Sequence, residues 1–305
     1  MANTSVNFPT PALASPQARD RTAPQALLAY CRRNPQLVIG AAMLLALLLV
    51  GVLGPFFVDP KQSQPLSAPT AQPPSRQYPL GTDDYGRNLL AVMVTGLPLT
   101  LRIGFLAGAL GLLIGTFLGF VSGYLGGPVD AVIRTLVDTS LTVPGLLILI
   151  TIAASIKGFI SVNIMALVIA SLAWRQPSRT VRAQVLTLRD RGYVQVARRS
   201  GMSTPEIIVK ELLPNLLPFL AASFVGAVSY AILASIGLEA LGLGPQNDPT
   251  LGMTVYWAIN FSAPLRGLWW WWLPPIVAVV ILILGLLLLT MGLDEIANPR
   301  LRRSA

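Results

Sequence analysis

Residues 193 to 215 read YVQVARRSGMSTPEIIVKELLPN and form the only long polar, cation-rich stretch in the chain. The long runs on either side of it are apolar enough to lie in lipid. The stretch interrupts these runs about two-thirds of the way along the chain. A membrane protein with one conspicuous polar helix pair is expected to present that pair to another molecule.

The composition identifies an integral membrane protein built from helices. Of 305 residues, 53% are hydrophobic and only 11% are charged, against about 25% charged residues in soluble domains. The net charge of +9 would suggest nucleic acid in a soluble protein. Here the cations cluster beside apolar runs, where their usual role is to orient spans. We therefore expect a lipid bilayer and no nucleic acid as a partner.

The residue types present exclude much of enzyme chemistry. The chain has no histidine and a single cysteine, Cys31. One copy therefore has no disulfide, no Cys/His zinc site and no histidine acid or base. Carboxylates remain available for metal binding or acid/base work. We predict that the chain is not an enzyme, with no catalytic residues and no metal site.

The apolar runs predict six transmembrane helices. The expected order is a cytoplasmic tail (1–36), a first span (37–58), an extracytoplasmic loop (59–96), a membrane core (97–293) and a cytoplasmic tail (294–305). A signal peptide would be shorter than the first run and would end in a small-x-small site, which is missing. Within the core the spans cover about 97–123, 136–156, 159–174, 212–241 and a last run ending near 292, and residues 175–211 form a cytoplasmic loop.

The distribution of cations supports this orientation. The predicted cytoplasmic segments hold 16 of the 22 lysines and arginines, eight of them in the loop 175–211. Such a bias sets the direction in which spans insert. Both termini are therefore expected in the cytoplasm.

The second predicted span carries glycines at 104, 108, 111, 115, 119 and 123. Steps of three and four keep them near one helix face. Small-residue faces let helices approach closely in lipid. We interpret this face as a packing surface, with direct substrate contact as the alternative.

Ionisable residues in or beside spans are the candidates for a transport pathway. Asp138 lies four residues after Arg134, so the two can simply pair on a helix face. Glu239 lies near the outer end of the fifth predicted span. Both acids are expected as substrate-pathway residues, and Glu239 is the better coupling-ion site if the protein works alone.

The outer loop 246–267 carries two further predictions. Residues 253–259 are expected to form a short amphipathic helix. Trp269 to Trp272 precede a span, where tryptophans commonly anchor the membrane interface. An aromatic or carbohydrate ligand platform is the alternative.

The central stretch predicts a helix-turn-helix. Residues 194–201 favour a short helix that stops at Gly201, and Ser203 with Glu206 forms a capping box for the next helix. Gln195-Val196-Ala197, three residues, Gly201, nine residues and then Glu211-Leu-Leu-Pro resemble the EAA loop of ABC-importer permeases. Gln195 and Val196 depart from the usual Glu and Ala.

Three further signatures resemble the dipeptide, oligopeptide and nickel branch of these permeases. They are PLGTDDYGRN from Pro79 to Asn88, GYLGGPVD with a following R-x-x-x-D from Gly123 to Asp138, and IANPRLR from Ile296 to Arg302. Asn88 stands where that branch has Asp. The resemblance covers about residues 30 to 303 and implies the type I importer permease fold.

The resemblance also implies the function. It suggests a permease subunit that imports peptides or a related solute by alternating access in a bacterial or archaeal cytoplasmic membrane. The implied partners are a second homologous permease, two ATPase subunits and an extracytoplasmic binding protein. The chain has no P-loop motif, so it needs no cofactor of its own, and ATP and Mg would be bound by the ATPases.

In such permeases the EAA loop is a coupling helix that seats in the ATPase. By resemblance, the coupling residues here are Tyr193, Gln195, Ala197, Arg198, Gly201, Ser203 and Glu206. Gly201 would permit the turn and a close approach, Ala197 would keep the helix thin and Tyr193 would anchor its start. The alternative is a stand-alone secondary transporter or channel.

Overall fold

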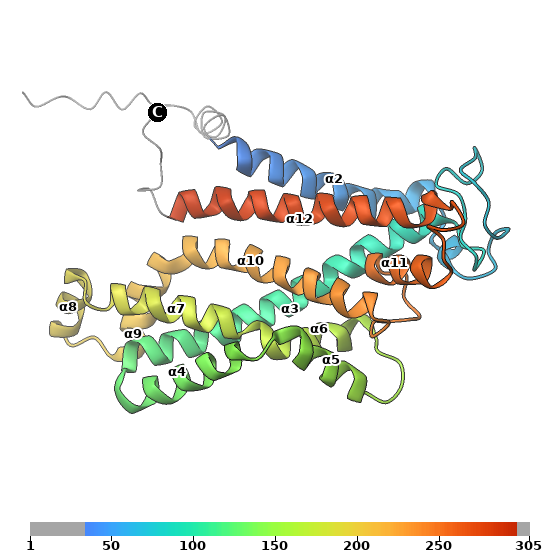
Figure 1. Cartoon of the computed structure of the whole chain (residues 1–305). Helices are drawn as coiled ribbons and strands as arrows, with labels where there is room; N and C mark the ends of the chain where they lie inside the picture. Colours follow the sequence, from blue (N-terminus) through green and yellow to red (C-terminus); the bar gives the residue numbers. More distant parts are fainter. Residues whose placement is uncertain (1–33, 298–305) are drawn as a thin grey trace, which may run out of the picture.

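The computed structural model describes residues 34–297, all of whose regular elements are helical (Figure 1). Nearly all of the two predicted tails, 1–36 and 294–305, and the IANPRLR signature lie outside the described residues. The longest helices are α2 (Pro35–Phe57), α3 (Leu89–Leu125), α10 (Leu213–Ala240) and α12 (Trp269–Ala297). Together they confirm an all-α membrane protein.

Four helical segments within residues 34–297 are long and apolar enough to cross a membrane: α2, α3, the continuous run Thr204–Ala240 and most of α12. Helices α4 (Gly127–Thr142) and α5 (Gly145–Ser155) are together long and apolar enough for a fifth crossing, but they meet at an angle of 84°. The apolar helix α6 (Val162–Ala173) is shorter. Six crossings therefore remain a prediction.

The third predicted span, residues 136–156, is not the single straight helix that the sequence suggested. The chain leaves the helix at Val143, whose backbone is extended (φ −84°, ψ 129°), and restarts after Pro144. A proline disfavours helical backbone at the residue before it and lacks the N–H of an internal helix bond. Pro144 therefore accounts for the bend between α4 and α5.

The fourth predicted span, residues 159–174, also differs from the structure. Only α6 forms there, and Trp174 stays in the helical region of backbone space (φ −76°, ψ −20°). The chain then continues as α7 (Arg175–Leu188). The predicted cytoplasmic loop 175–211 thus begins as a helix that packs along α3.

Helix α3 is the centre of the bundle. It contacts α7, α10, α6 and α2, and α12 packs on α2 and α10 (Figure 1). Buried side chains of α3, α6 and α10, including Ile103, Ile169 and Leu238, form one core cluster. A second cluster joins α10 with α12 through Ile232 and Leu282.

The glycine face of α3 is a packing surface, as predicted. All six of its glycines are buried. A Cβ placed on Gly104 or Gly108 would meet α10, and one on Gly111, Gly115, Gly119 or Gly123 would meet the end of α6 or α7. The absence of side chains lets two helices lie against α3 at backbone distance.

Gly115→Ala is expected to lower the stability of the chain by about 1–3 kcal/mol. The new Cβ would lie 2.6 Å from the Trp174 carbonyl oxygen and 2.9 Å from the Ser178 nitrogen, and backbone atoms cannot step aside. Thermal unfolding of the purified protein in detergent measures the effect. Gly226→Ala is the matched control, because nothing lies within 4 Å of its added Cβ. Equal stability of the two variants would contradict the packing role.

The end of the bundle opposite α8 is a folded cap. It contains η1 (Pro60–Ser63), the loop that follows η1, and α11 (Leu251–Asn260). Helix α11 confirms the short helix predicted at 253–259. The prediction of an interfacial tryptophan belt is wrong for Trp271, which is fully buried among Leu89, Ala258 and Ala263. Trp269 is half exposed. We call this cap the α11 end.

Candidate functional site

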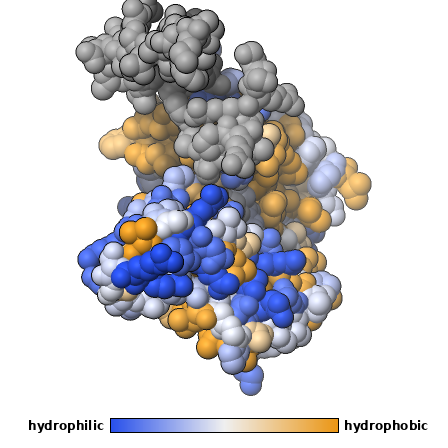
Figure 2. Space-filling view, turned by 90° about the vertical axis from the view of Figure 1, so that its left-hand side faces the viewer, coloured by the Kyte–Doolittle hydropathy of each residue, from blue (hydrophilic) through white to orange (hydrophobic). Residues whose placement is uncertain are grey.

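The polar stretch that divides the sequence lies at the opposite end of the bundle, which we call the α8 end (Figure 1). It forms α8 (Gly192–Arg199), α9 (Thr204–Glu206) and η2, a π-helical stretch (Ile207–Leu212) that continues into α10. The predicted helix-turn-helix is therefore present. Figure 2 shows that the part of this face below the grey atoms is largely hydrophilic, with some hydrophobic residues among the polar ones.

Helix α8 has one buried face and one exposed face. Val194 and Ala197 are buried in a cluster with Ile207 of η2 and Leu216 of α10. Val196 points away from this cluster and is 65% exposed. Val196 therefore adds an apolar side chain to the largely polar exposed face of α8.

The turn between α8 and α9 depends on Gly201, which adopts φ +81°. L-residues rarely adopt this backbone conformation, whereas glycine does so without steric cost. A Cβ on Gly201 would meet nothing within 4 Å. The turn therefore requires glycine for its backbone, and the space beside it is open.

The capping box after this turn is confirmed. The Ser203 backbone N–H and hydroxyl donate to Glu206 Oε2 at 3.2 and 3.1 Å. Lys210 donates to the other Glu206 oxygen at 3.1 Å. These contacts fix the start of the helix that leads into α10.

Arg198 connects α8 to the end of α3. Its Nη2 donates to the Tyr124 hydroxyl at 3.4 Å, and its guanidinium carbon lies 5.7 Å from the centre of the Tyr124 ring. Arg189, between α7 and α8, donates to the Gly123 carbonyl at 2.9 Å. The polar stretch is thus tied to the central helix as well as to α10.

Of the remaining predicted coupling residues, Tyr193 and Gln195 lie at the surface of α8. Tyr193 is 39% exposed. Partial burial, with the nearby Glu211 carboxylate, raises the pKa of its hydroxyl, and Arg191 opposes this shift. The structure therefore brings the seven predicted residues together on one hairpin, with Ala197 buried and the other six at the surface.

Asp138, one of the two predicted pathway acids, is exposed. No ion pair joins it to Arg134 within residues 34–297, so the expected pairing is wrong. The ion pair in this region is instead bidentate between Arg182 of α7 and Asp130 of α4, at 2.5 and 2.6 Å. Ser122 of α3 also donates to Asp130. Sequence spacing gave no signal for this link between α3, α4 and α7.

Glu239, the other predicted pathway acid, is completely buried at the α11 end. Its two carboxylate oxygens accept hydrogen bonds from the Ser235 and Thr250 hydroxyls, each at 2.7 Å. A Cβ on Gly252 would meet Glu239 Oε2, so the carboxylate lies against the first turn of α11. The carboxylate therefore lies at the N-terminus of α11, where the helix dipole favours a negative group.

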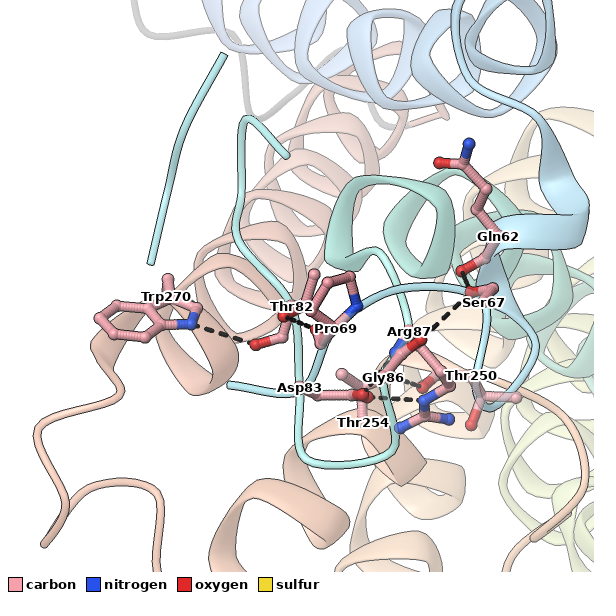
Figure 3. A network of polar contacts seen from close by, with 10 residues as sticks. All are labelled: Gln62, Ser67, Pro69, Thr82, Asp83, Gly86, Arg87, Thr250, Thr254 and Trp270. Atoms are coloured by element: carbon pink, nitrogen blue, oxygen red, sulfur yellow. Dashed lines mark hydrogen bonds and ion pairs between the residues drawn. The ribbon is translucent and has the colours of Figure 1, made fainter. Parts of the chain in front are cut away.

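A polar network orders the rest of the α11 end (Figure 3). Asp83 accepts from the backbone N–H of Arg87 at 2.9 Å and from its Nε at 2.6 Å. Burial raises the pKa of the Asp83 carboxyl, while Arg87 opposes the rise. Trp270 Nε1 donates to the Thr82 carbonyl at 3.2 Å, so the loop is tied to α12.

The α3 helix begins within this network. Asn88, which departs from the family pattern, accepts from the Leu90 N–H at 3.0 Å and so caps α3. Within residues 34–297 no group of three or more cysteine, aspartate or glutamate side chains is arranged to hold a metal ion.

Comparison with protein families gives one match over most of the chain. Residues 111–303 match the family described as binding-protein-dependent transport system inner membrane component. This segment includes α4 to α12 and the polar stretch.

Three relatives illustrate the sequence similarity. The dipeptide transport system permease protein DppC of Alkalihalophilus pseudofirmus is 30% identical over 70% of this chain and 70% of its own length. DppC of Bacillus subtilis is 29% identical over 89% of this chain and 84% of its own. The oligopeptide transport system permease protein OppC of Mycobacterium bovis is 33% identical over 60% of this chain and 64% of its own.

The fold is similar to that of a solved structure, the inward-facing MetNI methionine ABC transporter. The match has a TM-score of 0.55 at 22% identity and covers 69% of this chain and 97% of the other. At this identity the likeness shows the fold alone.

Proposed function

This chain belongs to the binding-protein-dependent transport system inner membrane component family, and we propose that it carries peptides across the membrane by means of a coupling helix, α8. It is a permease subunit of an ABC importer, and the dipeptide and oligopeptide permeases among its relatives support a peptide cargo. A nickel complex or another small solute is the remaining cargo class of this branch.

The observation that carries the coupling proposal is the exposed face of α8. A short helix at one end of the bundle presents Val196, Arg199 and Gln195 outward, and this end has the hydrophilic surface expected of a cytoplasmic face (Figure 2). An apolar side chain among cations can fill a pocket on a partner while the cations contact its rim. We assign this face to an ATPase subunit.

The buried face of α8 supplies a route from the ATPase to the spans. Val194 and Ala197 pack on η2 and α10, and Arg198 contacts Tyr124 of α3. A displacement of α8 would therefore be passed to both long helices, because packed side chains move together. The expected motion alternates the permease between inward-open and outward-open states.

The proposed assembly contains a second homologous permease, two ATPases that bind ATP and Mg, and an extracytoplasmic binding protein. In this assembly the α8 end faces the cytoplasm, the α11 end faces outward and both termini are cytoplasmic. The cation bias of the sequence supports this orientation. The setting is a bacterial or archaeal cytoplasmic membrane.

Co-purification with separately tagged ATPase subunits tests the proposal. We expect the chain, expressed with a companion permease, to retain ATPase subunits encoded beside it. Peptide uptake into vesicles should continue when ionophores dissipate ion gradients while ATP is maintained. Uptake that stops with the gradients, or a wild-type complex that retains no ATPase, would favour the stand-alone transporter instead.

A further inference from the structure

A cavity of about 510 Å³ opens between α6, α7, α10 and α12. Its volume lies within the range of small-molecule sites, about 300–1,000 Å³. Leu172, Ala222 and Ala227 provide part of an apolar wall, and the polar groups include Arg175, Tyr230 and Asp294. Sites for small ligands commonly combine such a wall with a few placed polar groups.

Arg175 is the cation of this cavity, and the residue is 5% exposed. Its Nε donates to the Leu172 carbonyl at 3.0 Å, and its Nη1 donates to the Ser140 carbonyl at 2.6 Å. Both acceptors are neutral. None of the five ion pairs in the described part of the chain includes Arg175. A buried cation without an anion is costly, so the site favours an incoming negative group.

Arg175 Nη2 and the Tyr230 hydroxyl have no hydrogen-bond partner among residues 34–297. A Cβ built on Gly145 would lie 2.5 Å from Arg175 Nη2 and 3.2 Å from the Tyr230 hydroxyl, so the two groups lie on the same side of Gly145. No hydrogen bond within residues 34–297 uses either of them. Arg175 is already oriented by its two carbonyl contacts, which leaves Nη2 ready to donate. A guanidinium N–H beside a hydroxyl is a suitable pair of donors for a carboxylate.

The second charged residue on the cavity wall, Asp294, sets the direction of binding. Asp294 belongs to α12, and α10 lies between α12 and α7 (Figure 1). Like charges repel, so a ligand carboxylate is disfavoured beside Asp294 and favoured beside Arg175.

We propose that this cavity binds the C-terminal carboxylate of a transported peptide through Arg175 and Tyr230. The identity of the ligand rests on the peptide import proposed above. The carboxylate accepts from Arg175 Nη2 and the Tyr230 hydroxyl, and the rest of the peptide lies along the apolar wall. The site selects for a free C-terminus and has little selectivity for the side chains of the peptide.

The test uses a cysteine reporter in the assembled transporter, reconstituted with its companion permease and ATPases. Ser223 lines the cavity, and Ser223→Cys in a Cys31→Ser background leaves this chain with a single thiol, whose reaction with a maleimide can be timed. The probes are trialanine and trialanine amide, which differ only at the carboxylate. We expect trialanine to protect the thiol at concentrations about tenfold lower than the amide, the factor for one charge-assisted hydrogen bond.

Three variants separate recognition from folding. Tyr230→Phe removes a hydroxyl that has no partner in the structure, so it should fold normally and weaken protection by trialanine severalfold. Arg175→Gln should remove the preference for the free acid, and Arg175→Lys should restore part of it. Arg179→Gln is the charge-matched control, because Arg179 is exposed and lines a different, smaller cavity. In this control, trialanine should protect the thiol as well as it does in the unaltered transporter.

The outcomes distinguish this site from the proposed function. Equal protection by both probes, no protection by either, or a preference that survives in Arg175→Gln would overturn the site. ATP-driven uptake of trialanine is measured in the same vesicles. Uptake without preferential protection leaves the import function standing and removes this site, whereas preferential protection without ATP-driven uptake supports the site and removes the import function.

Discussion

Gly201→Asp is expected to reduce ATP-driven uptake by at least about tenfold while the chain still folds and inserts. The reduction follows from placing an unpaired carboxylate in the contact between α8 and the ATPase, where a desolvated charge costs well over the 1.4 kcal/mol that corresponds to tenfold. Uptake and ATP hydrolysis are measured together in reconstituted vesicles. We expect hydrolysis to lose its dependence on cargo.

The structure explains why this substitution should act at the partner surface. Nothing lies within 4 Å of a Cβ on Gly201, so the new Cβ meets no atom of the chain itself. The remaining cost is the positive φ of +81°, about 1–2 kcal/mol for an L-residue and lower for aspartate. This cost is small enough to leave the helices in place.

Gly158→Asp is the matched control. Gly158 also has a positive φ, of +100°, and open space around its Cα, but it lies in the loop between α5 and α6, away from α8 (Figure 1). Its substitution introduces the same charge at another glycine with a positive φ. Loss of uptake in both variants, or in neither, would show that α8 is not the coupling surface.

Most features that lie within a single helix or turn were predictable from the sequence. The capping box of Ser203 and Glu206, the stop at Gly201 and the glycine face of α3 were predicted, because each depends on spacing within one helix or turn. The break at Pro144 was missed. Apolar composition continues through this proline, and the composition outweighed the backbone rule for the residue before it.

The spacing of residues in the sequence could not predict the polar contacts that join distant segments. Asp130 pairs with Arg182 across 52 positions, and Arg198 reaches Tyr124 across 74. The cavity depends on Arg175, which counted in the sequence only as one of many cytoplasmic cations. A cation that orients a span and a cation that lines a cavity have the same signature in sequence, and only packing distinguishes them.

Glu239 shows how the same acid can be assigned two different roles. The sequence favoured a pathway residue, since ionisable groups in spans are functional candidates. In the structure its carboxylate is buried against the first turn of α11 and accepts hydrogen bonds from Ser235 and Thr250. We propose that it anchors α11 to α10. A Cβ on Gly252 would collide with the carboxylate, so the chain has made room for it.

Glu239→Ala is therefore expected to destabilise the chain by about 3–5 kcal/mol. The change leaves the Ser235 and Thr250 hydroxyls without their acceptor, and it opens a cavity in a packed region. Thermal unfolding in detergent should show a melting temperature lower by about 10 °C. Asp248→Asn should change the melting temperature little. Asp248 lies in the loop between α10 and α11, and its side chain makes no hydrogen bond within the described residues.

Glu239→Gln separates the anchor from a pathway role. The amide keeps the shape of the side chain, its oxygen can accept from Thr250, and its nitrogen can donate to the Ser235 hydroxyl. An anchor therefore predicts that this variant retains most of the stability and most of the peptide uptake. A variant that folds as stably as the wild type and yet transports nothing would instead make the Glu239 carboxylate a group that binds cargo or a coupling ion, because only its charge has changed.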